Sequence, residues 1–263
     1  MPILFFGHGS PMNAITDNAF TQRLAQIGRD LPRPRAILCV SAHWMTEGTF
    51  VTGMEKPPTI HDFGGFPREL FEVQYPAPGS PVVAELVERE VAKTSAPAPV
   101  VGIDEDEWGL DHGTWSVLRH VFPQAEIPVL QLSLDMTKGP AYHFEMGERL
   151  RALREQGVLI VGSGNLVHNL RRIEWDPAAK PYAWALEFDA WTKSMLEDGN
   201  FGALTKDYLA TEAGRLAVPT PDHYFPALYI LGAADAKDRL AFEWEEMQNG
   251  SISMRTFSFG LRG

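Results

Sequence analysis

Histidine carries most of the potential chemistry in this sequence, because its imidazole binds metals and exchanges protons near neutral pH. Three apolar runs each end in a histidine motif: LFFGHG contains His8, LCVSAHW contains His43 and LIVGSGNLVHN contains His168. The runs have the length and composition of buried strands. Since the carboxyl ends of parallel strands meet at one edge of a sheet, we expect the three imidazoles to lie close together.

A fourth histidine, His223, lies in the segment VPTPDHYFPALYILGAA. Thr220 is of a type that caps helices, and a proline such as Pro221 is favoured at the first helical position. The spacing therefore predicts that His223 lies in the first turn of a helix, where the helix dipole disfavours protonation. A neutral imidazole is able to bind a metal.

Convergence of these histidines predicts a mononuclear metal site, because buried imidazoles need partners and metal binding commonly supplies one. The single cysteine, Cys39, lies in the apolar run AILCVSAHW, so neither an intrachain disulfide nor a cysteine-based zinc cluster is expected. Imidazole ligands suit iron(II), zinc, copper and nickel, and the residues alone do not choose among these metals.

The elements that must position these residues alternate along the chain. Runs typical of buried strands cover residues 2–7, 35–44, 127–134, 157–164 and 251–260. Apolar residues at helical spacing cover residues 81–92, 141–157 and 182–199. The alternation predicts one α/β domain over residues 1–263, with a mainly parallel or mixed central sheet flanked by helices. The metal site is expected at the carboxyl ends of the strands.

Composition excludes several classes of partner. The chain has 263 residues, of which 44% are hydrophobic and 22% charged, and its formal net charge is −11. Nucleic-acid binding is not expected, because affinity for phosphates comes from clustered Lys and Arg. No stretch reaches the roughly 18 consecutive apolar residues of a membrane span, and no basic and apolar leader precedes the first strand, so we expect no membrane partner and a cytoplasmic location.

Several motifs occur in order along the chain and carry a family resemblance: GHGSPM, SAHW, TIHDFGGFP, YPAPGSP, WGLDHGTW, HFEMG, GSGNLVHNLR and PTPDHYFPAL. Together they resemble the 4,5-DOPA extradiol dioxygenase family, a branch of the class III, protocatechuate 4,5-dioxygenase-like enzymes. The resemblance covers nearly the whole chain. It implies a single α/β domain with one non-haem divalent metal ion that binds a catechol and O₂ and opens the ring beside its two hydroxyls.

The resemblance also implies roles for individual residues. His8, His43 and His223 match metal ligands, and His223 stands where more distant class III enzymes have a glutamate. His168 matches an acid/base residue that also lies close enough to be a fourth ligand. His112, in WGLDHG, matches the other catalytic histidine. An all-imidazole site accepts zinc, which we expect in the protein as isolated, whereas ring cleavage requires the redox chemistry of iron(II).

Further residues are candidates for binding the substrate. His61 and Asp62, in the glycine-rich segment HDFGGFP, are placed to bind a substrate amino group at the mouth of the site, and Tyr224 to pack against the catechol ring. His120 and His143 lie in helical patterns and are expected to be structural. The expected reaction is 4,5-cleavage of L-DOPA to a seco-DOPA, a muconic semialdehyde, while caffeate, dopamine and protocatechuate remain open as substrates.

Two other functions are compatible with these residues. A zinc-dependent hydrolase is one, because three imidazoles and a water also make a hydrolytic site. No G-x-S-x-G or H-E-x-x-H motif is present, so such a hydrolase would depend on metal-bound water alone. The other is a non-enzymatic binding protein of the Memo type, which resembles class III dioxygenases.

Overall fold

A mixed β-sheet forms the centre of the computed structural model, which describes residues 1–93, 99–176 and 178–261. In that part of the chain the sheet has eight strands in the order β4-β3-β5-β2-β6-β1-β10-β7. The four central strands β5, β2, β6 and β1 are parallel to one another, whereas β3 pairs antiparallel with β5 and β10 pairs antiparallel with β1. This confirms the predicted α/β class with a mainly parallel, mixed sheet.

The bounds of the elements are as follows. The strands are β1 Ile3–Gly7, β2 Ala36–Thr46, β3 Thr49–Thr52, β4 Val101–Asp104, β5 Val129–Asp135, β6 Val158–Gly164, β7 Leu240–Trp244 and β10 Thr256–Phe259, with a separate hairpin of β8 Met247–Gln248 and β9 Ile252–Ser253. The helices are α1 Ala19–Asp30, α2 Arg68–Phe71, α3 Pro81–Ala92, α4 His112–Val121, α5 Pro140–Leu150, α6 Ala183–Glu197, α7 Phe201–Lys206, α8 Glu212–Ala217 and α9 Phe225–Ala233.

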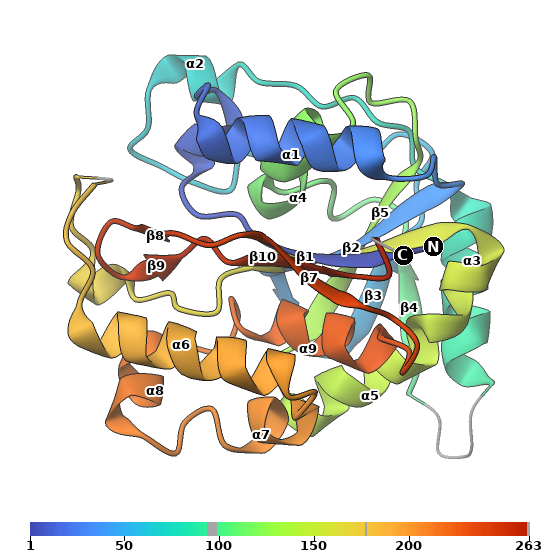
Figure 1. Cartoon of the computed structure of the whole chain (residues 1–263). Coiled ribbons are helices and arrows are strands. Elements are labelled where there is room, and N and C mark those ends of the chain that lie inside the picture. The colour runs from blue at the N-terminus through green and yellow to red at the C-terminus, as the bar shows by residue number, and fades with distance from the viewer. Residues whose placement is uncertain (94–98, 177, 262–263) are drawn as a thin grey trace.

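Helices cover both faces of the sheet. Figure 1 shows α1 and α4 on one side and α5, α6 and α9 on the other. Side chains alternate between the two faces along β1, because successive residues of a strand point in opposite directions. Leu4 and Phe6 join the core beneath α1 and α4, while Ile3 and Phe5 join the core that contains α5 and α9. In the described residues no helix is long and apolar enough to cross a membrane.

The expected elements form with three differences. Helix α3 coincides with the predicted 81–92. The predicted helix 141–157 ends at Leu150 and continues as a 3₁₀ helix over Arg151–Gln156. The predicted strand 251–260 is divided into β9 and β10, of which β9 pairs with β8 outside the main sheet. The third difference concerns β2.

Strand β2 does not end at His43 but passes through it with an irregularity. In the pairing of β2 with β5, the chain advances from Val40 to Met45 while β5 advances only from Leu132 to Leu134. The surplus residues of β2 therefore bulge away from β5 before pairing resumes. Bulges commonly reorient a side chain beside a functional site, and His43 lies within this one.

Candidate metal centre

Three histidines from distant parts of the chain meet at one edge of the sheet. His8 follows β1 directly, His43 lies in the bulge of β2, and His223 lies in the turn before α9. Their ring centroids are 5.0 to 5.3 Å apart, and one nitrogen of each lies within 4.8 Å of the others. The convergence that the sequence predicts is present, and this spacing suits a shared metal ion.

The environment of His8 selects its tautomer. Its Nδ1 lies 2.9 Å from the hydroxyl oxygen of Ser163. That hydroxyl donates its one hydrogen to the carbonyl of Gly113, at 2.5 Å, so it must accept from His8 Nδ1–H. Nε2 of His8 therefore carries no proton and keeps its lone pair for a ligand.

Two carboxylates select the same tautomer in the other histidines. Nδ1 of His223 forms a short hydrogen bond with the carboxylate of Asp222. Nδ1 of His43 lies 3.4 Å from Asp62 Oδ2. An ionised carboxylate only accepts hydrogen bonds, so each favours a proton on Nδ1 and leaves Nε2 free.

The protonation state of these imidazoles suits metal binding. Burial, reinforced by the neighbouring histidines, lowers the pKa of His8 and His223 well below the usual value, and lowers that of His43 to about 3. Nε2 of His8 and Nε2 of His43 are 3.3 Å apart. With both protons on Nδ1, two lone pairs face each other there, and a cation bound between them would relieve their repulsion. The donor set fits a divalent metal.

The helix-capping prediction for His223 is wrong in detail. Helix α9 begins at Phe225 with Tyr224 as its N-cap, and Thr220 makes no capping hydrogen bond to it. His223 lies in the preceding turn, in which the amide of Tyr224 donates to the carbonyl of Pro221. This turn packs so tightly on β6 that a Cβ on Gly164 would lie 2.2 Å from the carbonyl oxygen of His223. Burial, rather than a helix dipole, keeps the imidazole neutral.

The N-terminus of α4 positions a fourth imidazole, that of His112. Asp111 caps this helix by accepting from the amide of Thr114, and its buried carboxylate also accepts from Ser41 at 2.7 Å and from Gln131 at 2.6 Å. The cap fixes His112, the first residue of the helix. The ring centroids of His112 and His43 are 3.9 Å apart.

Asp62 connects two of the histidines. Its Oδ2 lies 2.9 Å from His112 Nδ1, and its Oδ1 accepts from the His112 amide at 2.9 Å. Burial raises the pKa of Asp62, but hydrogen bonding to His112 and the charges of His112 and His43 outweigh it, so the pKa falls to about 2. The carboxylate is ionised and orients both rings.

His168 lies beside the three-histidine group. It follows β6 and is held by a bridge to Ile252 and by its amide, which donates to the carbonyl of Ala217. Its ring stacks on that of His223, with centroids 3.5 Å apart. One ring nitrogen of His168 lies within 4.8 Å of ligand atoms of His223 and Asp222. His168 is not part of the group formed by His8, His43 and His223. Burial lowers the pKa of His168 to about 4, so the ring is neutral at pH 7.

A cavity of about 570 Å³ opens over these residues, a size typical of small-molecule sites. It is lined by the five histidines described above, by Asp62 and by residues of four further segments: His8, His43, His112, His168 and His223; Gly9–Asn13, Thr16 and Asn18; Phe63 and Phe66; Leu170, Ile173 and Trp175; Gln248, Asn249 and Ile252. Chemistry and space therefore coincide at the predicted edge of the sheet.

Two candidate substrate residues lie outside the cavity wall. Tyr224 is 1% exposed, donates its hydroxyl to the carbonyl of Leu204 and stacks on Tyr208 in the core. His61 is hydrogen-bonded through Nε2 to the carbonyl of Val73. Neither side chain is placed to touch a substrate in the cavity, because the turn at Tyr224 and the loop at His61 direct them into internal contacts.

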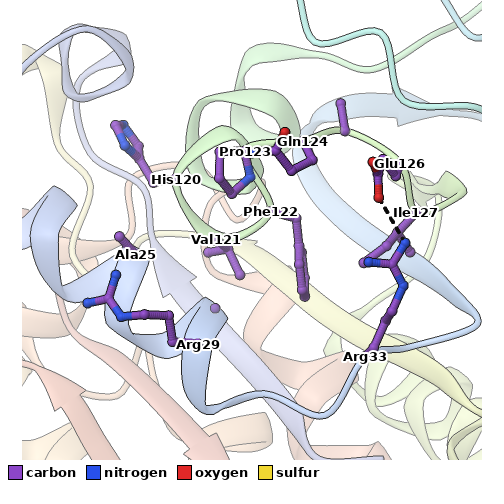
Figure 2. A pocket seen from close by; sticks show the side chains of 12 residues that line it. Ala25, Arg29, Arg33, His120, Val121, Phe122, Pro123, Gln124, Glu126 and Ile127 are labelled. Atoms are coloured by element: carbon purple, nitrogen blue, oxygen red, sulfur yellow. Dashed lines mark hydrogen bonds and ion pairs between the residues drawn. The ribbon is translucent and has the colours of Figure 1, made fainter.

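A second cleft lies between the C-terminal parts of α1 and α4, and Figure 2 shows its side chains. Arg33 and Glu126 form an ion pair across it, 3.1 Å apart. Its one histidine, His120, is hydrogen-bonded through Nε2 to the carbonyl of Asn13. Among the described residues that line this cleft there is no cluster of catalytic or ligand groups. His120 and the buried His143, which contacts the hydroxyl of Tyr229, lie outside the histidine cluster, as the sequence predicts.

Comparison with known proteins identifies the family. Residues 2–257 match the model of the catalytic LigB subunit of aromatic ring-opening dioxygenase. The chain belongs to this LigB family of class III extradiol dioxygenases. It is an extradiol ring-opening dioxygenase of the 4,5-DOPA dioxygenase type, which confirms that prediction over the hydrolase and Memo-type alternatives.

Two relatives and one solved structure are similar to this chain over nearly its whole length. A 4,5-DOPA dioxygenase extradiol of Escherichia coli K12 is 48% identical over 99% of this chain and 95% of its own length. A 4,5-DOPA dioxygenase extradiol of Beta vulgaris is 33% identical over 97% of this chain and 95% of its own. A crystal structure of an uncharacterized E. coli K12 protein matches with a TM-score of 0.85 and 43% identity, over 99% of this chain and all of the other.

Sequence reasoning missed the residues that orient the imidazoles. Asp222 directly precedes His223, and an acidic neighbour of a proposed ligand is a signal that could have been used. Ser163 lies in the strand-end motif GSGN, and Asp111 directly precedes His112. The contact of Ser163 with His8 depends on the pairing of β1 with β6, strands far apart in the sequence, so no local pattern reveals it. The contact of Asp111 with Thr114 is local and typical of a helix N-cap.

Proposed function

We propose that this chain cleaves the ring of a catechol, with L-DOPA as the substrate to test first, in the cavity above the histidine cluster. The observation that carries the proposal is the arrangement of His8, His43 and His223, each with Nδ1 engaged and Nε2 free. These three residues would hold one divalent metal ion. Zinc fits three neutral imidazoles in the protein as isolated, and iron(II) is the metal proposed for turnover.

When bound, iron(II) would supply the Lewis acidity that makes a catechol hydroxyl easier to ionise and the redox capacity that O₂ chemistry needs. His168 and His112 line the same cavity and are the proposed acid/base residues. His168 is neutral at pH 7 and can accept a hydroxyl proton. His112 has Nδ1 beside the Asp62 carboxylate, which orients its ring.

The contacts between the rings suggest how the proposed roles are divided. The two acid/base histidines flank the metal-binding group on different sides, since His112 contacts His43 and His168 contacts His223. One imidazole can therefore take a proton from the catechol hydroxyl. The same or the other imidazole can return a proton to the substrate as its aromatic ring opens. Asp62 acts as the positioning residue for His112 and His43. We also propose that His168 is a fourth metal ligand when no substrate is bound.

The test is reconstitution without oxygen, followed by addition of O₂ and a catechol. Protein loaded with iron(II) should consume about one O₂ per L-DOPA and form a yellow product, as dioxygenase stoichiometry requires. His168→Ala should lose this reaction with iron(II) in excess. No O₂ consumption with L-DOPA, caffeate, dopamine or protocatechuate would refute the proposal, and so would elemental analysis that finds no zinc or iron in the protein as isolated.

A further inference from the structure

The wall of the cavity combines its five histidines, called here the histidine floor, with a large apolar part. Eight of its side chains are apolar, and they come from four separate segments: Pro11, Met12, Phe63, Phe66, Leu170, Ile173, Trp175 and Ile252. Leu170 and Trp175 are 58% and 82% exposed, which is unusual for side chains of this size. Large exposed apolar side chains gathered at the mouth of a cavity mark a surface that binds an apolar group.

The described residues of the cavity wall also include no lysine or arginine side chain. Among its described residues there is no lysine, arginine or glutamate, and Asp62 is its one carboxylate. Asp62 is engaged by His112 and His43. Arg171 and Arg172 follow Leu170 in sequence, but both are exposed and neither belongs to the wall.

Two amide side chains of the wall already donate hydrogen bonds to backbone carbonyls. Asn13 donates to the carbonyl of His8 at 3.1 Å, and Asn249 donates to the carbonyl of Glu174 at 2.7 Å. They are therefore poorly placed to replace the water around a charged group. A carboxylate on the ring substituent would lose hydration without gaining a lysine or arginine partner in the wall, which is costly. The net charge of −11 adds a general repulsion of anions.

We infer that the cavity selects catechols whose ring substituent is uncharged and apolar over catechols that carry a carboxylate. This rests on the proposed function, since it assumes that the catechol hydroxyls occupy the histidine floor. The substituent then extends along Phe63 and Phe66 toward Leu170 and Trp175. L-DOPA, with its carboxylate, is accepted but is not the preferred member of the class.

A matched pair of ligands tests this charge selection. Methyl caffeate and caffeate share one scaffold and differ in the carboxylate. Titration calorimetry on zinc-loaded protein without oxygen measures binding independently of turnover. The ester should bind at least about tenfold more tightly than the acid, a ratio worth about 1.4 kcal/mol. Equal binding, tighter binding of the acid, or no binding of the ester would overturn the inference. Iron(II)-loaded protein that binds the ester but cleaves no catechol would instead refute the proposed function alone.

A pair of arginine variants separates charge from the added methyl group. Leu170→Arg places a cation at the mouth, and Leu186→Arg places the same residue at a 49% exposed position on α6, outside the cavity wall. Leu170→Arg should reduce the ester-to-acid ratio at least about fivefold, as expected for a close ion pair with partial screening. Leu186→Arg should leave it unchanged. An equal response of the two variants would contradict selection by charge within the cavity.

Discussion

The hydroxyl of Ser163 lies between His8 Nδ1 and the carbonyl of Gly113, at 2.9 Å and 2.5 Å. It links the residue after β1 to the first turn of α4 and determines which nitrogen of His8 is free. The same relationship recurs with a carboxylate at His223 and His43. The ligand nitrogens are thus preset by hydrogen bonds on the far side of each ring.

Ser163→Ala should weaken metal binding by about 10- to 100-fold, the usual effect of removing a partner that orients a metal ligand. The measurement is competition with a chelator for zinc. Ser133→Ala is the matched control, because Ser133 is also a fully buried serine of the sheet but bonds to Thr46 and Phe50 rather than to a histidine. Equal affinity in the wild type and Ser163→Ala would contradict the orienting role.

His112→Phe should keep its metal and lose turnover. The substitution removes a proton carrier outside the His8, His43 and His223 group, so metal content should stay near the wild-type value while kcat falls by about 10² to 10⁴. Elemental analysis and O₂ consumption measure the two effects separately. An unchanged kcat would return His112 to a structural role, and loss of metal would make it a ligand.

Gly164→Ala should displace the turn that carries His223. The added Cβ would lie 2.2 Å from the carbonyl oxygen of His223, a backbone atom that can move only together with its turn. We expect a loss of about 1–3 kcal/mol in the free energy of unfolding together with reduced metal content. Gly139→Ala is the control, since nothing lies within 4 Å of a Cβ at that position. Normal zinc content in Gly164→Ala would show that the turn tolerates displacement.

The metal-free protein should lose stability as the pH falls below about 6.5. The pKa of His43 is about 3 and that of His168 about 4 in the folded chain, both below the usual value of 6.5. At a pH between the folded pKa of each histidine and 6.5, the unfolded chain binds more protons than the folded chain. The free energy of unfolding therefore falls as the pH falls, by up to about 1.4 kcal/mol per pH unit for each histidine. Asp62, with a pKa of about 2, contributes below pH 4.

Urea unfolding at pH 7.5, 6.0 and 5.0 measures this slope. His43→Asn should reduce the slope between pH 6.0 and 5.0, because one buried group that resists protonation is removed. A stability that does not change over this range would show that the imidazoles are not held neutral by burial.

The fold class and the meeting of the histidines at one edge follow from patterns within the sequence, whereas the order of the strands and the exact placement of each ring do not. The apolar runs predict the central strands, and their histidine endings predict one shared edge. The bulge at His43 depends on how β2 pairs with β5, which lies some 90 residues away. A local pattern holds no information about that register.

Tyr224 illustrates the same limit for the cavity. Its position next to His223 suggests a residue that contacts the substrate, but adjacent side chains in a turn point in different directions. The Tyr224 ring packs on Tyr208 in the core instead. Met12, Leu170 and Trp175, which do line the cavity, come from two segments far apart in the sequence, so only the folded arrangement shows that they share one wall.

The most direct test of the account is ring cleavage of L-DOPA under ¹⁸O₂ by iron(II)-loaded protein, followed by mass spectrometry of the product. The account predicts a seco-DOPA or its cyclised form that contains both oxygen atoms of O₂, apart from exchange at the aldehyde. A cis,cis-muconate from cleavage between the hydroxyls, an ortho-quinone, or product without ¹⁸O would contradict it.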